Sequence, residues 1–467
     1  MVQRIPAEIF PTLMKAASPL DNSERVLLVG VALKRALRAG MVSSGAAGRE
    51  SLVELQELVH SAGARVVGSR LQMRDTLDSA TLVGSGMLVE LKEEAERLNA
   101  GLIILDRNLS PVQHRNIERG TDCRVIDRTQ LILDIFARHA HSREGQLQVE
   151  LAQLNYLLPR LAGSKRELSR LGGGIGTRGP GEQKLETDRR RIRERVGKIE
   201  RSIETVRRQR ALRRRARQAV PLGTVALVGY TNAGKSTLFN ALTHAEVFVS
   251  PKMFATLDPT IRAVRLPSRR RVLLSDTVGF IRDLPADLIA AFRATLEEAQ
   301  ESAVIVHVTD ISSPSHAEQD AEVEKVLEYL GVADRPRLRV FNKVDRLAPD
   351  EFETLRKSHD RKFLQASESS PVGGHYPSVF VSAQTGKGLD ELRQRIDEAM
   401  PVDPIVARRL NVPLANGREL AMIYACGRVL RSEVQDGHIC LDAELPESLA
   451  ARLENFGDSS ESERPRI

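Results

Sequence analysis

The sequence predicts a multidomain α/β protein with a phosphate-binding-loop (P-loop) domain at its centre. Residues 229–237 form a glycine-rich loop between an apolar strand pattern and an amphipathic helix pattern. Strand and helix patterns alternate over residues 25–140, and two helical seams flank a glycine-rich loop at 172–182. We therefore expect a small parallel α/β domain and an antiparallel helical arm before the central domain, and a small α+β domain after it.

Composition bounds the class of protein. The chain has 467 residues, a length typical of about three domains. Hydrophobic residues make up 41% and charged residues 28%, which is typical of folded domains. The three cysteines, Cys123, Cys426 and Cys440, show no paired spacing, which argues against a disulfide framework or structural zinc. Because we find no cleavable leader and no run of about 18 apolar residues, we expect a cytoplasmic protein.

The domain boundaries follow from shifts in pattern. We predict an N-terminal α/β domain over 1–141, a helical arm over 142–218, a nucleotide domain over 219–400, and a small domain with a tail over 401–467. The N-terminal domain should hold a parallel sheet, because its strand patterns are separated by helix patterns. Those strands are expected at 26–31, 64–67 and 102–106, and the helices at 51–60 and 87–99.

Two apolar seams predict an antiparallel coiled coil. The spacing of both is close to alternating steps of four and three residues. Pro159 should kink or end the first arm. The seams consist of Leu147, Leu151, Leu154, Leu158 and Leu161, and of Leu185, Ile192, Val196, Ile199, Ile203 and Val206.

The second arm is strongly basic, with fifteen Lys or Arg against five Asp or Glu between residues 184 and 217. The excess favours a polyanion such as RNA over a solvated helix face, because counterion release would stabilise the complex. The loop at 172–182 holds six glycines, which predicts a backbone that approaches RNA closely rather than a plain linker. The candidate RNA contacts are Arg178, Arg189, Arg190, Arg191 and Arg193.

The loop at 229–237 has the composition of a triphosphate site. Gly229 and Gly234 let backbone N–H groups converge on an anion, and the following helix adds its positive end. Lys235 can reach the β- and γ-phosphates, and the Ser236 hydroxyl can bind Mg²⁺. Asn232 could bind a potassium ion beside the phosphates, or it could only stabilise the turn.

Polar segments after three further strand patterns predict guanine and magnesium recognition. Asp276 can hold the Mg²⁺ water shell, and the Gly279 amide can meet the γ-phosphate. Asp345 would accept hydrogen bonds from guanine N1 and its 2-amino group, and the backbone at 382–386 would contact O6. Phe280 stands where many GTPases carry a Gln that orients the attacking water, so intrinsic GTP hydrolysis should be slow.

The loop at 254–260 should sense the γ-phosphate. Thr256 and Thr260 are both candidates to complete Mg²⁺ coordination on chemistry alone. We expected this segment, like the others, at the carboxyl end of a strand. Further along, residues 358–377 are polar and contain Gly and Pro, which predicts a loop.

Nearly the whole chain resembles the HflX-type GTPases, ribosome-associated proteins. The most specific matches are 172–182, 147–153 (Leu-Gln-Val-Glu-Leu-Ala-Gln), 229–237 and 254–258. The resemblance implies binding of the large ribosomal subunit, splitting of stalled or idle ribosomes, and Thr256 as the Mg²⁺ ligand. Met87 and Asn108 depart from the family pattern, which weakens any transfer of an ATP-linked activity to the N-terminal domain.

The predicted site is therefore that of a GTP hydrolase, expected to be a monomer when free. Its catalytic residues would be Lys235, Thr256 and Gly279, and its Mg²⁺ ligands Ser236, Thr256 and, through water, Asp276. The alternatives are a GTP-regulated RNA-binding assembly or remodelling factor and an ATP-driven RNA unwinder. The predicted GTP contacts are Gly229, Tyr230, Thr231, Asn232, Ala233, Gly234, Lys235, Ser236, Thr237, Phe254, Ala255, Thr256, Leu257, Asp258, Asp276, Thr277, Val278, Gly279, Asn342, Lys343, Val344, Asp345, Ser382, Ala383 and Gln384.

Overall fold

The computed structural model divides into two compact units. One comprises Met1–Val206, Val249–Asp258 and Ile281–Thr295, and the other comprises Arg207–Phe248, Pro259–Phe280 and Leu296–Ile467. No helix among the described residues is long and apolar enough to span a membrane. The structure describes residues 24–34, 44–161, 180–218, 223–243, 253–254, 256–282, 298–332, 335–369, 378–401, 403–435, 437–453 and 456.

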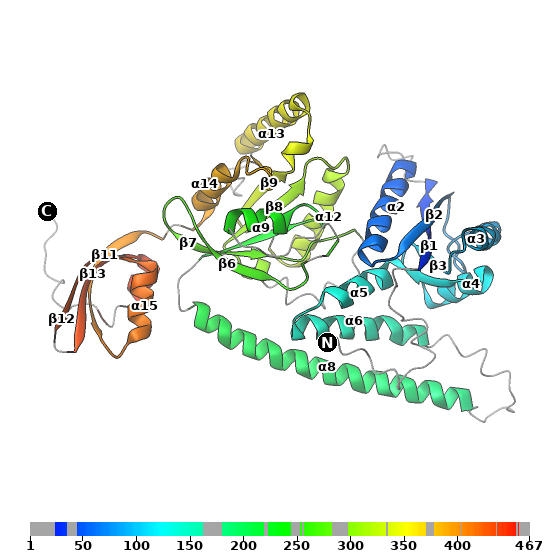
Figure 1. Cartoon of the computed structure of the whole chain (residues 1–467), viewed down its shortest axis with the longest axis horizontal. Helices are drawn as coiled ribbons and strands as arrows, with labels where there is room; N and C mark the ends of the chain where they lie inside the picture. The colour runs from blue at the N-terminus through cyan, green and yellow to red at the C-terminus, as the bar shows by residue number, and fades with distance from the viewer. Residues whose placement is uncertain are drawn as a thin grey trace. The chain divides into compact units, whose positions relative to one another are not determined.

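A four-stranded parallel sheet forms the N-terminal domain, as the alternating pattern predicts. Its strand order is β2-β1-β3-β4, and every pairing is parallel (Figure 1). Apolar side chains of β1 and β3, among them Leu27 and Ile103, are fully buried in its core. The elements are β1 (Arg25–Leu33), α2 (Ser44–Ser61), β2 (Arg65–Arg74), α3 (Ser85–Leu98), β3 (Leu102–Leu105), α4 (Pro111–Thr121), β4 (Arg124–Asp127) and α5 (Arg128–His139).

The helical arm consists of α6 (Arg143–Leu161) and α8 (Pro180–Gln218). The predicted seam is confirmed, because five of its apolar residues are buried together with Leu151, Leu158 and Val196 packed against them: Leu147, Leu154, Ile192, Ile199 and Ile203. Pro159 was expected to kink or end the first arm, and it does not end α6, which continues past it to Leu161.

The end of α6 is tied to the N-terminal domain by Arg160. One guanidinium nitrogen donates to the Leu109 carbonyl at 2.8 Å and to the Asp127 carboxylate at 3.0 Å, and the other donates to the Tyr156 carbonyl. These charge-assisted bonds hold the last turn, so the hydrogen bond that Pro159 cannot donate is not enough to stop the helix. At the other arm, α8 begins at Pro180, inside the predicted loop, because proline suits the first helical position.

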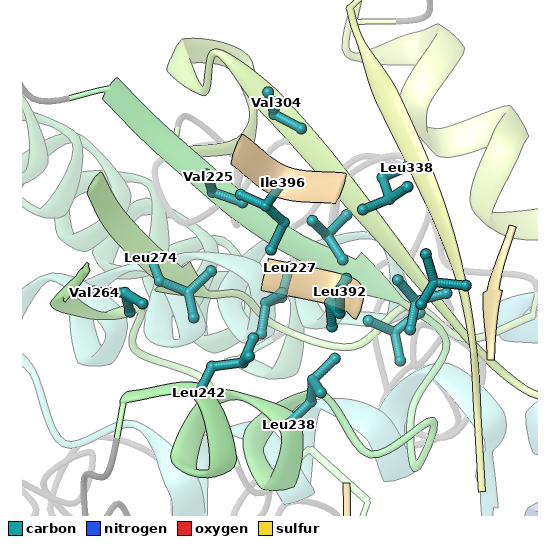
Figure 2. Packing of buried hydrophobic residues seen from close by; sticks show 14 of the residues in the cluster. Val225, Leu227, Leu238, Leu242, Val264, Leu274, Val304, Leu338, Leu392 and Ile396 are labelled. Carbon is teal, nitrogen blue, oxygen red and sulfur yellow. The ribbon is translucent and has the colours of Figure 1, made fainter. Parts of the chain in front are cut away.

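The central domain is built on a six-stranded sheet in the order β10-β9-β8-β5-β7-β6. Helices pack on it, and Figure 2 shows Leu238 and Leu242 of α9 with Val225 and Leu227 of β5 in the same buried core. The elements are β5 (Gly223–Gly229), α9 (Lys235–Thr243), β6 (Thr260–Arg265), β7 (Arg271–Asp276), β8 (Val304–Asp310), α12 (His316–Tyr329), β9 (Arg337–Asn342), η3 (Val344–Arg346), α13 (Pro349–Ser369), β10 (Val379–Phe380) and α14 (Leu389–Ala399).

The edge strand β6 runs antiparallel to β7, while the other strand pairs of this sheet are parallel. The segment at 254–260 therefore precedes its strand instead of following one, which corrects the expectation from the sequence. The antiparallel pairing sets Thr260 opposite Asp276. The start of β6 thus reaches the same sheet edge as the carboxyl ends of the parallel strands.

The C-terminal domain is a three-stranded antiparallel sheet with two helices, as expected for a small α+β domain. Its strand order is β11-β13-β12, and Leu410, Ile423 and Leu441 are buried in its core. The elements are β11 (Ile405–Pro413), α15 (Gly417–Cys426), β12 (Arg428–Gln435), β13 (His438–Pro446) and α16 (Glu447–Arg452). All three cysteines of the chain are free.

Candidate functional site

The phosphate loop connects β5 to α9 and depends on two glycines. Gly229 lies so close to β8 that a Cβ on it would stand 2.2 Å from the Val308 carbonyl oxygen. Gly234 has φ +90°, and a Cβ there would meet the Asn342 side-chain nitrogen at 2.3 Å. Only glycine can stand this close to Val308 and Asn342, because any other residue would place a Cβ there. The two glycines therefore allow the chain to turn sharply from β5 into α9.

Lys235 is buried at the start of α9 and bends back over the loop. Its Nζ donates to the carbonyl oxygens of Tyr230 at 2.8 Å and Gly229 at 3.2 Å. Burial lowers the pKa of Lys235 to about 8, although the nearby Asp276 carboxylate opposes the shift and Lys343 adds to it. A phosphate placed at the loop would favour the charged form, so this lysine is suited to bind an anion.

Two observations show that the loop suits a magnesium-bound phosphate. The Thr231 hydroxyl is buried and finds no hydrogen-bond partner among the described residues, which is the state expected of a group that meets a ligand. The Ser236 hydroxyl donates to the fully buried Asp276 carboxylate at 2.6 Å. Hydroxyl and carboxylate oxygens are the ligands that Mg²⁺ prefers. The predicted Mg²⁺ residues Ser236 and Asp276 are thus brought together.

The segment after β7 is bonded directly to the phosphate loop. The Phe280 amide donates to the Gly229 carbonyl at 3.1 Å, and the Thr231 amide donates to the Phe280 carbonyl at 2.7 Å. A Cβ on Gly279 would stand 2.9 Å from both the Lys235 Nζ and the Thr231 Cα, so no side chain fits there. The Phe280 side chain is buried and carries no polar atom that could orient water.

On the base side, Asn342 joins the phosphate loop to the loop after β10. Its buried side chain donates to the Ala233 carbonyl at 2.9 Å and accepts from the Ala383 amide at 3.0 Å. Ser382 is fully buried, and its hydroxyl accepts from the Thr385 amide at 3.1 Å. Asp345 lies in η3 and is exposed, so its carboxylate is available to an incoming base.

Residues 253–254 and 256–258 pack within the N-terminal unit. The Asp258 carboxylate accepts from the Ser142 amide at 2.7 Å, the His141 amide at 3.2 Å and the Ser142 hydroxyl, at the point where α6 begins. Phe254 is buried edge-on against Phe136, with ring centroids 4.5 Å apart. No local sequence pattern predicted these contacts, because their partners lie more than a hundred positions away. The nucleotide role of Thr256 and Asp258 stays a prediction.

The predicted RNA contacts lie on or next to α8. Arg190, Arg191 and Arg193 are exposed, and Arg189 is half-buried. Among the described residues, Arg190 and Arg193 form only long ion pairs with exposed glutamates, at 3.7 and 3.9 Å. Such exposed pairs contribute little, so these cations stay available to phosphate groups. Arg178 and most of the glycine-rich loop lie outside the described residues.

The fold and the site together define a P-loop GTPase. Three family models match the chain: the N-terminal region of GTP-binding GTPases at 49–137, their middle region at 139–217, and the 50S ribosome-binding GTPases at 224–343. Among curated relatives, the GTPase HflX of Caldanaerobacter subterraneus is 44% identical over 91% of this chain and 94% of its own length.

Other relatives agree with these matches. The GTPase HflX of Lacrimispora saccharolytica is 43% identical over 94% of this chain and 97% of its own length. That of Escherichia coli is 42% identical over 85% of this chain and 90% of its own length. The chain belongs to the HflX family of ribosome-binding GTPases, and it is a GTP hydrolase.

Proposed function

We propose that this GTPase binds the large ribosomal subunit in its GTP-bound state and uses that binding to split stalled or idle ribosomes into subunits. The observation that supports this proposal is that hydrogen bonds connect three segments of the site to one another. Asn342 holds the loop after β10 to the phosphate loop, and the phosphate loop is bonded to the segment after β7. A nucleotide bound there would therefore affect all three segments at once.

The residues divide the chemistry among themselves. Lys235 and the amides of the phosphate loop would bind the phosphates, and the Gly279 amide would meet the γ-phosphate. Ser236, Thr256 and, through water, Asp276 would hold Mg²⁺, which supplies neutralisation of the phosphate charge when it is bound. Asp345 would select guanine. The remaining predicted GTP contacts would line the same site.

Slow intrinsic hydrolysis follows from Phe280. Its buried ring offers no hydrogen bond to the attacking water, so the ribosome would have to supply the missing order. Asn232 has a left-handed backbone, with φ 60°, and an exposed position beside the phosphate loop. We keep it as a candidate potassium ligand, tested by comparing turnover in potassium and sodium salts.

The helical arm would bind ribosomal RNA through its positively charged side chains. The candidate contacts Arg189, Arg190, Arg191 and Arg193 lie on one stretch of α8, and the apolar seam with α6 stiffens that stretch. We propose that they bind phosphates of ribosomal RNA, together with Arg178 and the glycine-rich loop. The proposed place of action is the cytoplasm, where ribosomes work.

Ribosome-dependent turnover tests the proposal. GTP hydrolysis by the purified chain should rise at least about tenfold when large subunits are added, because the ribosome completes the site. Replacing the four α8 arginines by glutamine should abolish most of this rise. A matched control removes the same charge elsewhere, by replacing Lys325, Arg356, Lys357 and Arg395 with glutamine, and should keep it. No stimulation of the unaltered chain would refute the proposal.

The alternative is a GTP-regulated RNA-binding assembly or remodelling factor. The exposed arginine stretch on α8 favours it equally, since RNA binding alone would use the same charges. Shortening the loop at 172–182 separates the two. Splitting of 70S ribosomes, followed by light scattering, should be lost if the loop acts as a wedge. Splitting that survives while RNA binding fails would favour the alternative.

A further inference from the structure

The side chain of Lys343, the residue directly after β9, is held by an ion pair. Its Nζ donates to the Asp310 carboxylate at 2.6 Å, and about 15% of each side chain is exposed. Lys343 is one of the GTP contacts predicted from the sequence, whereas no role was predicted for Asp310. The two residues come from adjacent strands, because Asp310 ends β8 opposite Asn342, the last residue of β9.

The Asp310 carboxylate is oriented by its own turn. One of its oxygens accepts from the Ser312 amide at 3.0 Å and from the Ser312 hydroxyl at 2.6 Å, which leaves the other oxygen directed to Lys343. The Ile311 amide donates to the Asn342 carbonyl at 3.1 Å and fixes the turn against the end of β9. A carboxylate held in this way is preorganised, so the ion pair loses little side-chain entropy when it forms.

The path of the Lys343 side chain brings it beside the phosphate loop. Its backbone is left-handed, with φ 66°, and its Cε lies 3.9 Å from the place that a Cβ on Gly234 would occupy. With its backbone fixed at one end and its ammonium fixed at the other, the four-carbon stem forms an apolar strip next to the loop. Such a strip suits the flat face of a purine, as the stems of lysines often cover apolar surface.

We propose that Asp310 is a positioning residue for the nucleotide, acting through Lys343 on the face of the purine ring. This inference rests on the proposed guanine site. The Asp310 carboxylate holds the Lys343 stem in place before the base arrives, so binding needs no further ordering of that side chain.

A double-mutant cycle tests the inference. Asp310→Asn keeps the size of the side chain but loses the charge, and it should weaken binding of a fluorescent GDP about tenfold. Lys343→Met keeps the stem but loses the ammonium, and it should have a similar effect. The double variant should be no weaker than either single variant, because both remove the same interaction. Losses that multiply in the double variant would overturn the proposal.

Two controls separate positioning from general damage. Ser312→Ala removes one hydrogen bond to Asp310 but leaves the ion pair, so it should keep GDP affinity within about threefold. Asp310→Asn should raise the KM for GTP and leave kcat at saturating GTP unchanged, because the phosphate side is intact. It should also weaken GDP and IDP equally, since the purine face is the same in both. A loss of kcat or a selective effect on GDP would contradict the role.

The outcome also distinguishes this inference from the proposed function. If the unaltered chain binds no guanine nucleotide, the proposed site itself fails. If the unaltered chain binds GDP and Asp310→Asn binds it equally well, only the role of Asp310 fails. Should Asp310→Asn not fold, Lys343→Met and Lys343→Arg test the pair from the other side. Lys343→Arg can keep the ion pair, so this variant should bind GDP within about threefold of the unaltered chain. Equal weakening in Lys343→Arg and Lys343→Met would refute the role of the ion pair.

Discussion

Nucleotide binding should take up protons through Lys235. Burial lowers the pKa of this lysine to about 8, so half of the molecules hold it neutral at pH 8. Phosphate oxygens beside the ammonium favour the charged form and raise the pKa again. If the bound form is fully protonated, the uptake is roughly 0.1 proton at pH 7, 0.5 at pH 8 and 0.9 at pH 9.

The sign of the effect follows from the same linkage. The bound state holds more protons than the free state between pH 8 and the raised pKa, so a higher pH favours the free state. GDP affinity should fall about tenfold between pH 7 and pH 9. Titration calorimetry in buffers of different ionisation enthalpy measures the uptake directly. At pH 8 and 9 the terminal phosphate is already ionised and contributes little.

Lys235→Arg is the matched control. An arginine stays charged throughout this range, so its GDP affinity, however weakened, should not change between pH 7 and pH 9. Proton uptake near zero at pH 9 in the unaltered chain would refute the reasoning, and so would an equal uptake in Lys235→Arg. Either result would mean that the buried ammonium is not the group that meets the phosphates.

Three further predictions concern stability and the site. His307 is buried, and the carboxylates of Asp320 and Glu324, 3.2 and 3.6 Å from its ring nitrogens, outweigh burial and raise its pKa. Its charged form therefore stabilises the fold below pH 6.5, and this is lost as pH rises through the folded pKa. His307→Asn should cost more stability at pH 6 than at pH 9 in urea unfolding, and an equal cost at both would contradict this. Gly279→Ala should lower GTP turnover at least about tenfold in a stopped assay, since its Cβ meets the phosphate loop at 2.9 Å; unchanged turnover would show that the loop yields easily. Ser142→Ala removes the acceptor of the Gly145 amide at the start of α6 and should cost about 1 kcal/mol, with faster hydrogen exchange at 253–258; unchanged exchange there would disprove the link.

Local patterns sufficed for much of the fold and the phosphate site. The strand, glycine-rich turn and helix at 223–243 are encoded in adjacent residues, so spacing alone predicts the positions of Gly229, Lys235 and Ser236. The seam of α6 and α8 likewise repeats at coiled-coil spacing. Both features depend on neighbours in the sequence, which is where periodicity carries information.

Other features depend on partners that are distant in the sequence. The contact between Asp258 and Ser142 joins residues 116 positions apart, and no local pattern marks either residue for the other. The antiparallel direction of the edge strand β6 was not predicted, because the hydrophobic periodicity and polarity of a segment do not indicate in which direction its strand runs. The segment at 358–377 was predicted as a loop, yet α13 runs to Ser369, and residues 370–377 lie outside the described residues. The glycines and prolines of this segment, which disfavour a helix, all stand after Ser369. The composition averaged over 358–377 therefore indicated a loop where the first part is helical.

The central claim is that the nucleotide controls binding of the ribosome. The direct test is the affinity of the purified chain for large ribosomal subunits, measured by sedimentation with no nucleotide, with GDP and with a non-hydrolysable GTP analogue. We predict binding at least about tenfold tighter with the analogue than with GDP, a coupling of roughly 1.4 kcal/mol. Equal affinity in all three conditions would contradict the account.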